Sequence, residues 1–285
     1  MTATTFDRSA QAGFVGVLRR AMPRDELFAG LYVLGCANGI GGVVIVALNN
    51  NDDWLGVVLS ISAIVLFACF AGVSLMLHDK TDEIRLVDLV MGTVFIIFVT
   101  LSTGALIWAA VTALSLYLLL FTNGTSERKR GAMILLAATV PMLWSRLLFA
   151  FFAKFFLIFD SSLVATLLGT QRDGNMVRFA DGSGDLVIFP GCSSVANVSL
   201  AFLCWVTAAQ ATNHRRSPAD IGWCLLACVS VIVVNVTRMS LEGLSRSNFL
   251  ALHNSYGDMI FNTATIILMG LCVMIGVRRE LFSRA

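Results

Sequence analysis

Charged side chains are scarce in this 285-residue sequence. Only 13% of its residues are charged and 57% are hydrophobic, and the mean hydropathy is +0.82. A soluble domain has about 25% charged residues, so this chain has too little polar surface to enclose a water-soluble globule of its size. The formal net charge of only +2 gives no reason to expect a nucleic acid as partner. The composition predicts an all-α polytopic membrane protein in a lipid bilayer.

We expect neither a cleavable signal peptide nor a disulfide framework. Residues 1–26 are polar and mixed, without the apolar core of a signal peptide. Cys192 is the exception among seven cysteines, because the others lie in apolar runs, where cysteine acts as a small apolar residue. Those six are Cys36, Cys69, Cys204, Cys224, Cys228 and Cys272.

Eight apolar runs approach the roughly 20 helical residues that cross a hydrocarbon core. The predicted spans are 27–48, 54–77, 86–101, 105–121, 132–159, 193–211, 219–240 and 255–277. The stretch 86–121 is too long for one crossing, and Ser102-Thr103-Gly104 offers a tight turn between two short helices. A single bent helix is the alternative, and it would invert every later span.

The distribution of Lys and Arg predicts the orientation, because these residues concentrate in short cytoplasmic loops. With both termini inside, 14 of the 20 Lys and Arg residues fall in inner segments and three in outer ones. The other three, Arg146, Lys154 and Arg238, fall within spans. The predicted organisation is a cytoplasmic segment 1–26, spans within 27–159, an outer loop 160–191, spans within 192–277 and a cytoplasmic tail 278–285.

The outer loop 160–191 is the longest extramembrane piece. Its first part, 161–168, is apolar enough to form a short helix along the membrane surface. Two apolar runs, 176–179 and 185–189, then flank the turn-forming segment 180–184, which is typical of a β-hairpin. The hairpin ends at Pro190-Gly191, directly before Cys192.

The predicted topology brings three reactive residues to the same outer depth. Cys192 opens the sixth span, Arg238 lies near the outer end of the seventh, and His253 opens the eighth. An imidazole can take the proton of a thiol that attacks an acyl group. We expect Cys192 at a helix N-terminus, where free N–H groups favour a thiolate.

Arg238 could stabilise an oxyanion or bind a substrate carboxylate. Asn235 is one helical turn earlier and could add a donor. Glu242 and Asp258 lie near the predicted site, and either could orient His253 or neutralise Arg238.

Each of these residues also has a purely structural interpretation. Cys192 could be a structural helix-start residue, Arg238 could extend its charge to the headgroups, and His253 could be an interfacial residue. Arg146 and Lys154 share roughly one face of the fifth span, where Arg146 could pair within the bundle or line a substrate path.

Three segments resemble the exosortase/archaeosortase family. They are 190–194 (Pro-Gly-Cys-Ser-Ser), 235–238 (Asn-Val-Thr-Arg) and 253–257 (His-Asn-Ser-Tyr-Gly). The family's patterns are Cys-Ser-Gly, Asn-x-x-Arg, and His followed four residues later by Gly. The resemblance covers about residues 160–277, and Ser194 departs from it by standing where Gly is usual.

This resemblance implies an integral membrane cysteine peptidase or transpeptidase at the outer face of a prokaryotic cytoplasmic membrane. Its partners would be exported proteins with a C-terminal transmembrane sorting tail of the PEP-CTERM kind. Cys192 would be the nucleophile, His253 the general base and acid, and Arg238 the transition-state stabiliser. The supporting residues would be Asn235, Ser193, Ser194, Glu242 and Gly257. Nothing in the sequence calls for a cofactor or a metal, or indicates an oligomeric state.

Two other functions fit the composition. A transporter or flippase for an anionic substrate would use Arg146, Lys154 and Arg238 along one path, but the sequence lacks the inverted repeat and paired broken helices of many transporters. A non-catalytic membrane scaffold would hold exported tails without cutting them.

Overall fold

The computed structural model describes residues 23–49, 63–78, 83–101, 104–121, 126–215 and 217–278, and these are mostly helical. Several sequence-based expectations lie outside the described residues. They concern the segment up to residue 22, the beginning of the span predicted at 54–77, the turn residues 102–103, Arg216 and the tail from residue 279.

Four helical stretches are long and apolar enough to cross a membrane: Ser126–Leu168, Pro190–Ala211, Ala219–Glu242 and Tyr256–Gly276. A helix also lies at each of the other predicted spans, three of them shorter apolar helices of 10–17 residues. The chain divides into two compact units, one ending at Leu136 and the other beginning at Ala137.

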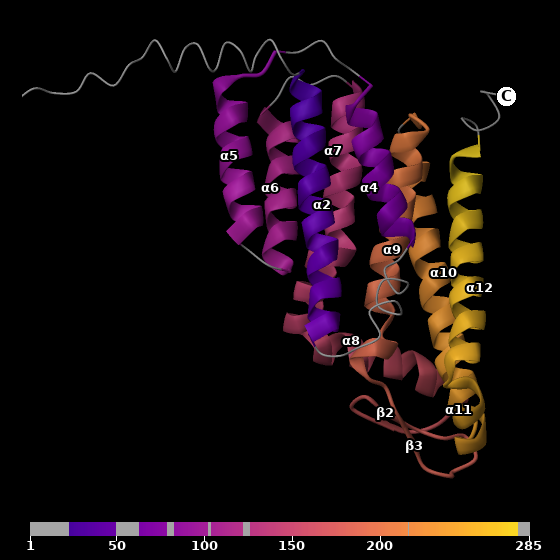
Figure 1. Ribbon diagram of the computed structural model, residues 1–285. Helices are drawn as coiled ribbons and strands as arrows, with labels where there is room; N and C mark the ends of the chain where they lie inside the picture. The colour runs from indigo at the N-terminus through magenta and orange to yellow at the C-terminus, as the bar shows by residue number, and fades with distance from the viewer. Residues whose placement is uncertain are drawn as a thin grey trace, which may run out of the picture. The chain divides into compact units, whose positions relative to one another are not determined.

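The first unit is a bundle of antiparallel and parallel helices (Figure 1). Its helices are α2 (Arg24–Asn49), α4 (Ala63–Met76), α5 (Leu86–Leu101), α6 (Ala105–Phe121) and most of α7 (Ser126–Thr139). The prediction of two helices within 86–121 is confirmed, since α5 and α6 are separate and pack against each other. Gly104 has φ +60°, a left-handed conformation that favours glycine before α6.

Buried ion pairs join the helix ends of the first unit. Arg24 Nη2 lies 2.7 Å from Asp88 Oδ1, and both side chains are fully buried. The Tyr117 hydroxyl donates to the same oxygen at 2.7 Å, while Arg128 pairs with Asp25 through both Nε and Nη2. An isolated buried charge is costly, and in each pair the opposite charge of the partner compensates this cost. Arg24 and Arg128, which the sequence assigns to inner segments, are therefore buried links between helices.

The second unit begins where α7 passes into a π-helical turn, η1 (Val140–Trp144), and then into α8 (Ser145–Leu168). Pro141 lacks an N–H and crowds the preceding turn, which explains the local change of helix type. A second break lies at Phe152, where φ is −121° and ψ is 21°.

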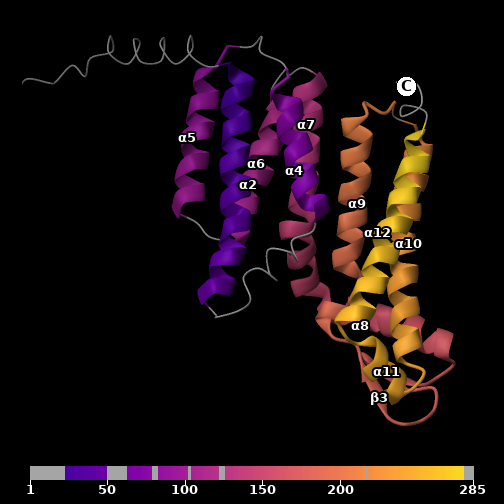
Figure 2. The same ribbon diagram turned by 45° about the vertical axis from the view of Figure 1, so that its right-hand side comes forward.

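The later part of α8 runs crosswise to α9, α10 and α12 (Figures 1 and 2). The expectation of a separate surface helix at 161–168 is thus wrong in one respect: these residues are the last turns of α8. This helix ends at Leu168 and is capped by Gly169 with φ +65°.

The predicted β-hairpin is confirmed and gains one strand. Strands β1 (Arg172–Asp173), β2 (Met176–Arg178) and β3 (Asp185–Val187) form an antiparallel sheet in that order. In β2 and β3 the register pairs Val177 with Leu186, and both side chains are buried. The alternation of apolar and polar residues therefore determines which face of the hairpin is buried.

A short 3-10 helix, η2 (Pro190–Cys192), leads into three helices: α9 (Ser194–Ala211), α10 (Ala219–Glu242) and α12 (Ser255–Gly276). Helix α10 packs between α9 and α12. The short helix α11 (Arg246–Leu252) joins α10 to α12, a region expected only as a loop.

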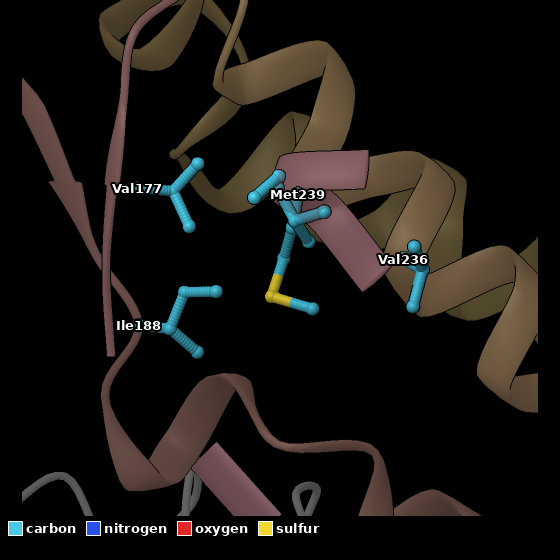
Figure 3. Close-up of a cluster of buried hydrophobic side chains, with 6 residues drawn as sticks. Val177, Ile188, Val236 and Met239 are labelled. Atoms are coloured by element: carbon cyan, nitrogen blue, oxygen red, sulfur yellow. The ribbon is translucent and has the colours of Figure 1, made fainter. Parts of the chain in front are cut away.

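A buried cluster fastens the sheet to the helices. Figure 3 shows Met239 of α10 pointing toward Val177 and Ile188 of the hairpin, with Val236 one turn away. Val164 and Ala165 of α8 complete the buried set, and Cys192 packs against it. This cluster holds the hairpin at the end of α10 where Glu242 lies.

Replacing Gly131 by Ala should lower the free energy of unfolding by about 1–3 kcal/mol, because α4 and α7 approach closely there. A Cβ at Gly131 would lie 2.6 Å from the backbone oxygen of Gly72. Gly30→Ala is the matched control, since nothing lies within 4 Å of its Cβ position, and it should leave stability unchanged or raise it by up to about 1 kcal/mol. Thermal unfolding in detergent measures both. Equal effects would contradict the close contact.

Candidate active site

Cys192 lies between the hairpin and helix α9. Pro190 starts the 3-10 turn, and the Cys192 N–H donates to the Phe189 carbonyl at 2.9 Å. Ser193 is the N-cap of α9, and its hydroxyl accepts a long hydrogen bond from the Val195 N–H. We expected Cys192 to open this helix. It lies two residues before Ser194, the first residue of α9, and within the helical stretch Pro190–Ala211.

A buried polar network fixes the backbone at Cys192. Asn235 Nδ2 donates to the Cys192 carbonyl at 2.8 Å and to Ser194 Oγ at 3.0 Å. Asp160 accepts from the Ser194 hydroxyl at 3.0 Å and from its N–H at 3.1 Å. A carboxylate at this position also suits the positive end of the α9 dipole. Asn235 and Ser194 thus belong to the site as structural supports.

Asp160 is a site residue that sequence reasoning missed. It is only 2% exposed near the end of α8, and its one signal in the sequence is a single acidic residue after an apolar run. Ser194, which stands where the family that the sequence resembles usually has Gly, has a structural role here. Its hydroxyl joins Asp160 to Asn235, which a glycine could not do.

Arg238 is held between two carboxylates. Its Nε donates to Glu242 Oε1 at 3.0 Å, one helical turn along α10, and its Nη2 lies 2.5 Å from Asp258 Oδ1 on α12. Glu242 is 3% exposed and Asp258 is 49% exposed. The ion pair between Arg238 and Asp258 therefore joins the end of α10 to the first turn of α12.

His253 lies at the junction of α11 and α12. Its ring stacks on Phe249, with centroids 4.6 Å apart and an interplanar angle of 16°, and its Nδ1 is 3.6 Å from Glu242 Oε2. That separation is longer than a hydrogen bond but within ion-pair range. Of the two carboxylates that could orient His253, the contacts select Glu242, while Asp258 contacts Arg238.

A glycine sets the geometry of this junction. Asn254 caps α12 by accepting from the N–H groups of Tyr256 and Gly257. A Cβ on Gly257 would lie 1.9 Å from the Leu252 carbonyl oxygen, so only glycine fits. The spacing from His253 to Gly257 thus has a steric reason.

Cys192, Glu242 and His253 line one cavity of about 350 Å³. The structure brings these three predicted residues to one cavity, whereas Arg238 and Asn235 are not among its lining residues. Two further lining residues, Arg246 and Phe249, come from α11 and were not predicted. Because η2, α10 and α11 each contribute lining residues, the shape of the cavity depends on how these elements pack against one another.

The tip of the hairpin packs against the turn between α10 and α11. The N–H groups of Ala180 and Asp181 donate to the carbonyls of Gly243 and Leu244, at 3.0 and 3.2 Å. Ser183 donates side-chain and backbone hydrogen bonds to the Asp181 carboxylate, which lowers the pKa of Asp181. These bonds hold the hairpin tip, whose Ser183 lines the cavity, against the end of α10.

Arg146 and Lys154 take no part in this site. Both are exposed on α8, the break at Phe152 falls between them, and neither forms an ion pair within the described part of the chain. The pairing considered for Arg146 is therefore not observed. Among the described residues, no group of three His, Cys, Asp or Glu side chains could hold a metal ion.

No protein-family model matches this chain, and neither a curated protein nor a solved structure matches it.

Asp160→Ala should destabilise the protein by about 1–3 kcal/mol, because the buried N–H and hydroxyl of Ser194 lose their acceptors. Asp173→Ala removes an exposed carboxylate from β1 and should change stability by less than about 0.5 kcal/mol. Thermal unfolding in detergent compares the two. An Asp160 variant as stable as the Asp173 control would contradict the buried network.

Gly257→Ala should displace His253, because the new methyl group collides with the Leu252 carbonyl. The expected result is a loss of about 1–3 kcal/mol in unfolding free energy together with loss of any His253-dependent chemistry. Gly270→Ala, in the same helix with nothing within 4 Å, is the control. Unfolding curves of the two variants should separate, and coincident curves would contradict the steric argument.

Proposed function

We propose that this protein is an integral membrane cysteine peptidase or transpeptidase of the exosortase/archaeosortase type. The observation that carries the proposal is the placement of Cys192 and His253 on one cavity, with the buried Glu242 behind the imidazole. A thiol, an imidazole and an orienting carboxylate are the parts that acyl transfer by a cysteine nucleophile needs. The three sequence segments that resemble the family contain or adjoin these residues.

In the proposed reaction, His253 takes the proton of Cys192 and the thiolate attacks a backbone carbonyl carbon of the substrate. The tetrahedral intermediate collapses, the C–N bond breaks, and the leaving amine takes the proton from the imidazolium. A thioester remains on Cys192. Water or an acceptor amine then gives a proton to His253 and attacks the thioester. The C–S bond breaks, and the imidazolium passes its proton to the sulfur of Cys192, which restores the thiol.

Glu242 acts in this scheme as a positioning residue. With its carboxylate facing Nδ1, the ring presents Nε2 as the basic nitrogen, and the 3.6 Å separation can shorten when substrate binds. Arg238 holds Glu242 from the other side. The role of transition-state stabiliser implied by the resemblance would require its guanidinium to reach the cavity, so in this arrangement we propose that Arg238 acts first through Glu242.

The proposed substrates are exported proteins with a C-terminal transmembrane tail that docks laterally between helices. The surplus of Lys and Arg in the segments predicted to be cytoplasmic supports a cavity on the outer side of the cytoplasmic membrane. The end of the helices that carries the hairpin would then face outward.

Cys192→Ala should abolish processing, because Cys192 supplies the one thiol among the described residues that line the cavity. Mass spectrometry of the C-termini of exported proteins, in cells making wild type or variant, measures this directly. Cys224→Ala, which removes a half-buried thiol from α10, should process normally. If exported proteins are processed at their C-termini in the Cys192 variant as in wild type, Cys192 is not the nucleophile.

Glu242→Gln should keep the fold but lower kcat on the order of 10²- to 10⁴-fold, because the neutral amide cannot stabilise the imidazolium as the carboxylate does. Asp258→Asn should have a smaller effect, since Asp258 touches Arg238 and not His253. Kinetics on a processed substrate should place the Glu242 effect in kcat, with KM nearly unchanged. Equal losses for both variants, or a change in KM alone, would contradict the positioning role.

A further inference from the structure

Strand β3 has one edge without a partner among the described strands. The sheet order is β1-β2-β3, so β2 covers only one side of β3. The N–H of Phe179 donates to the Gly184 carbonyl, and the N–H of Ile188 donates to the Asn175 carbonyl. Since bonded pairs alternate along an antiparallel ladder, Leu186 is the β3 residue that bonds to β2.

The backbone groups of Asp185 and Val187 therefore point away from β2. Each offers one N–H and one carbonyl at the free edge, the arrangement to which an additional strand can bind. Both residues of this edge, Asp185 and Val187, line the same cavity as Cys192 and His253. Beyond Val187 the chain continues directly through Ile188 and Phe189 into η2, which carries Cys192.

The other walls of the cavity suit a peptide. Phe179, Phe189 and Phe249 supply apolar surface, and α11 contributes Arg246 and Phe249 to the lining. An extended peptide beside β3 would point alternate side chains to opposite faces. Its backbone could bond to the free edge of β3 while its side chains contact the apolar walls.

We infer that the substrate binds as an extended peptide segment that adds a fourth strand to this sheet, along the free edge of β3. This inference rests on the proposed function, since it says how that site holds the backbone next to the attacking sulfur. Recognition comes from main-chain hydrogen bonds to Asp185 and Val187, as in other cases of strand addition. The bound strand presents its carbonyl to Cys192 at the end of the edge.

The test uses the full chain in detergent and two alkylating probes. Acetyl-tetraalanine chloromethyl ketone carries a peptide backbone, and iodoacetamide does not. Each reacts with the Cys192 thiol by displacement of its halide, and mass spectrometry gives the rate at Cys192 separately from the other cysteines. N-methylated versions of the tetraalanine probe remove one N–H at a time.

Strand addition predicts a period of two in the N-methyl series. Methyl groups at alternate positions should slow alkylation about tenfold, because each removes a hydrogen bond and blocks the edge, whereas the intervening positions should change little. Val187→Pro removes the N–H at the free edge without removing one from the β2 ladder, and should slow the peptide probe about tenfold while leaving the iodoacetamide rate unchanged.

Arg172→Pro is the matched control. Arg172 lies on the other outer edge of the same sheet, and because the N–H of Arg178 donates to the Gln171 carbonyl, the Arg172 N–H also points outward. Its rate with the peptide probe should match that of wild type. An N-methyl series without alternation, or equal rates for both proline variants, would overturn strand addition while leaving an iodoacetamide-reactive Cys192 in place as nucleophile.

Hydrogen exchange decides the inference even if Cys192 is chemically inert. In Cys192→Ala, excess acetyl-tetraalanine amide should protect the Asp185 and Val187 amides, with mass spectrometry following the exchange. Absence of protection at saturating peptide would overturn the proposal. Protection without peptide, accompanied by a dimer, would also overturn it by assigning the edge to a second copy of the chain.

Discussion

The buried carboxylate of Glu242 is the contact on which the candidate site depends. One of its oxygens accepts from Arg238 and the other faces His253, so a single side chain connects α10, the α11–α12 junction and, through Arg238, the first turn of α12. Burying an unpaired carboxylate that is 3% exposed would be unfavourable, because the charge loses its hydration. The neighbouring guanidinium of Arg238 compensates this loss. The position of the imidazole relative to Cys192 follows from this arrangement.

A second set of polar contacts keeps Cys192 in place. Asp160, Ser194 and Asn235 come from α8, α9 and α10, and together they satisfy the first turn of α9 and the Cys192 carbonyl. The sulfur itself makes no part of this network. The backbone is thus held from behind while the thiol remains at the cavity, which is the separation of roles that a preorganised nucleophile needs.

Local patterns predicted the hairpin and the positions of the helices, because turn residues at 180–184 and long apolar runs act over short distances. The convergence of Cys192 and His253 followed from topology. Asp160 and the α11 residue Phe249 escaped prediction because their partners are distant in sequence or on an unpredicted helix. The buried pair Arg24 and Asp88 escaped for the same reason: in the sequence Arg24 is one more inner-loop arginine, and only packing makes it a buried link.

The most direct test is the rate at which iodoacetamide alkylates Cys192 at pH 7, compared between wild type and His253→Ala. If His253 takes the proton of this thiol, wild type should react faster by about tenfold or more, and Cys224 should react equally in both proteins. Equal rates at Cys192 in wild type and variant would show that the imidazole does not act on the sulfur, and the account of the site would fail.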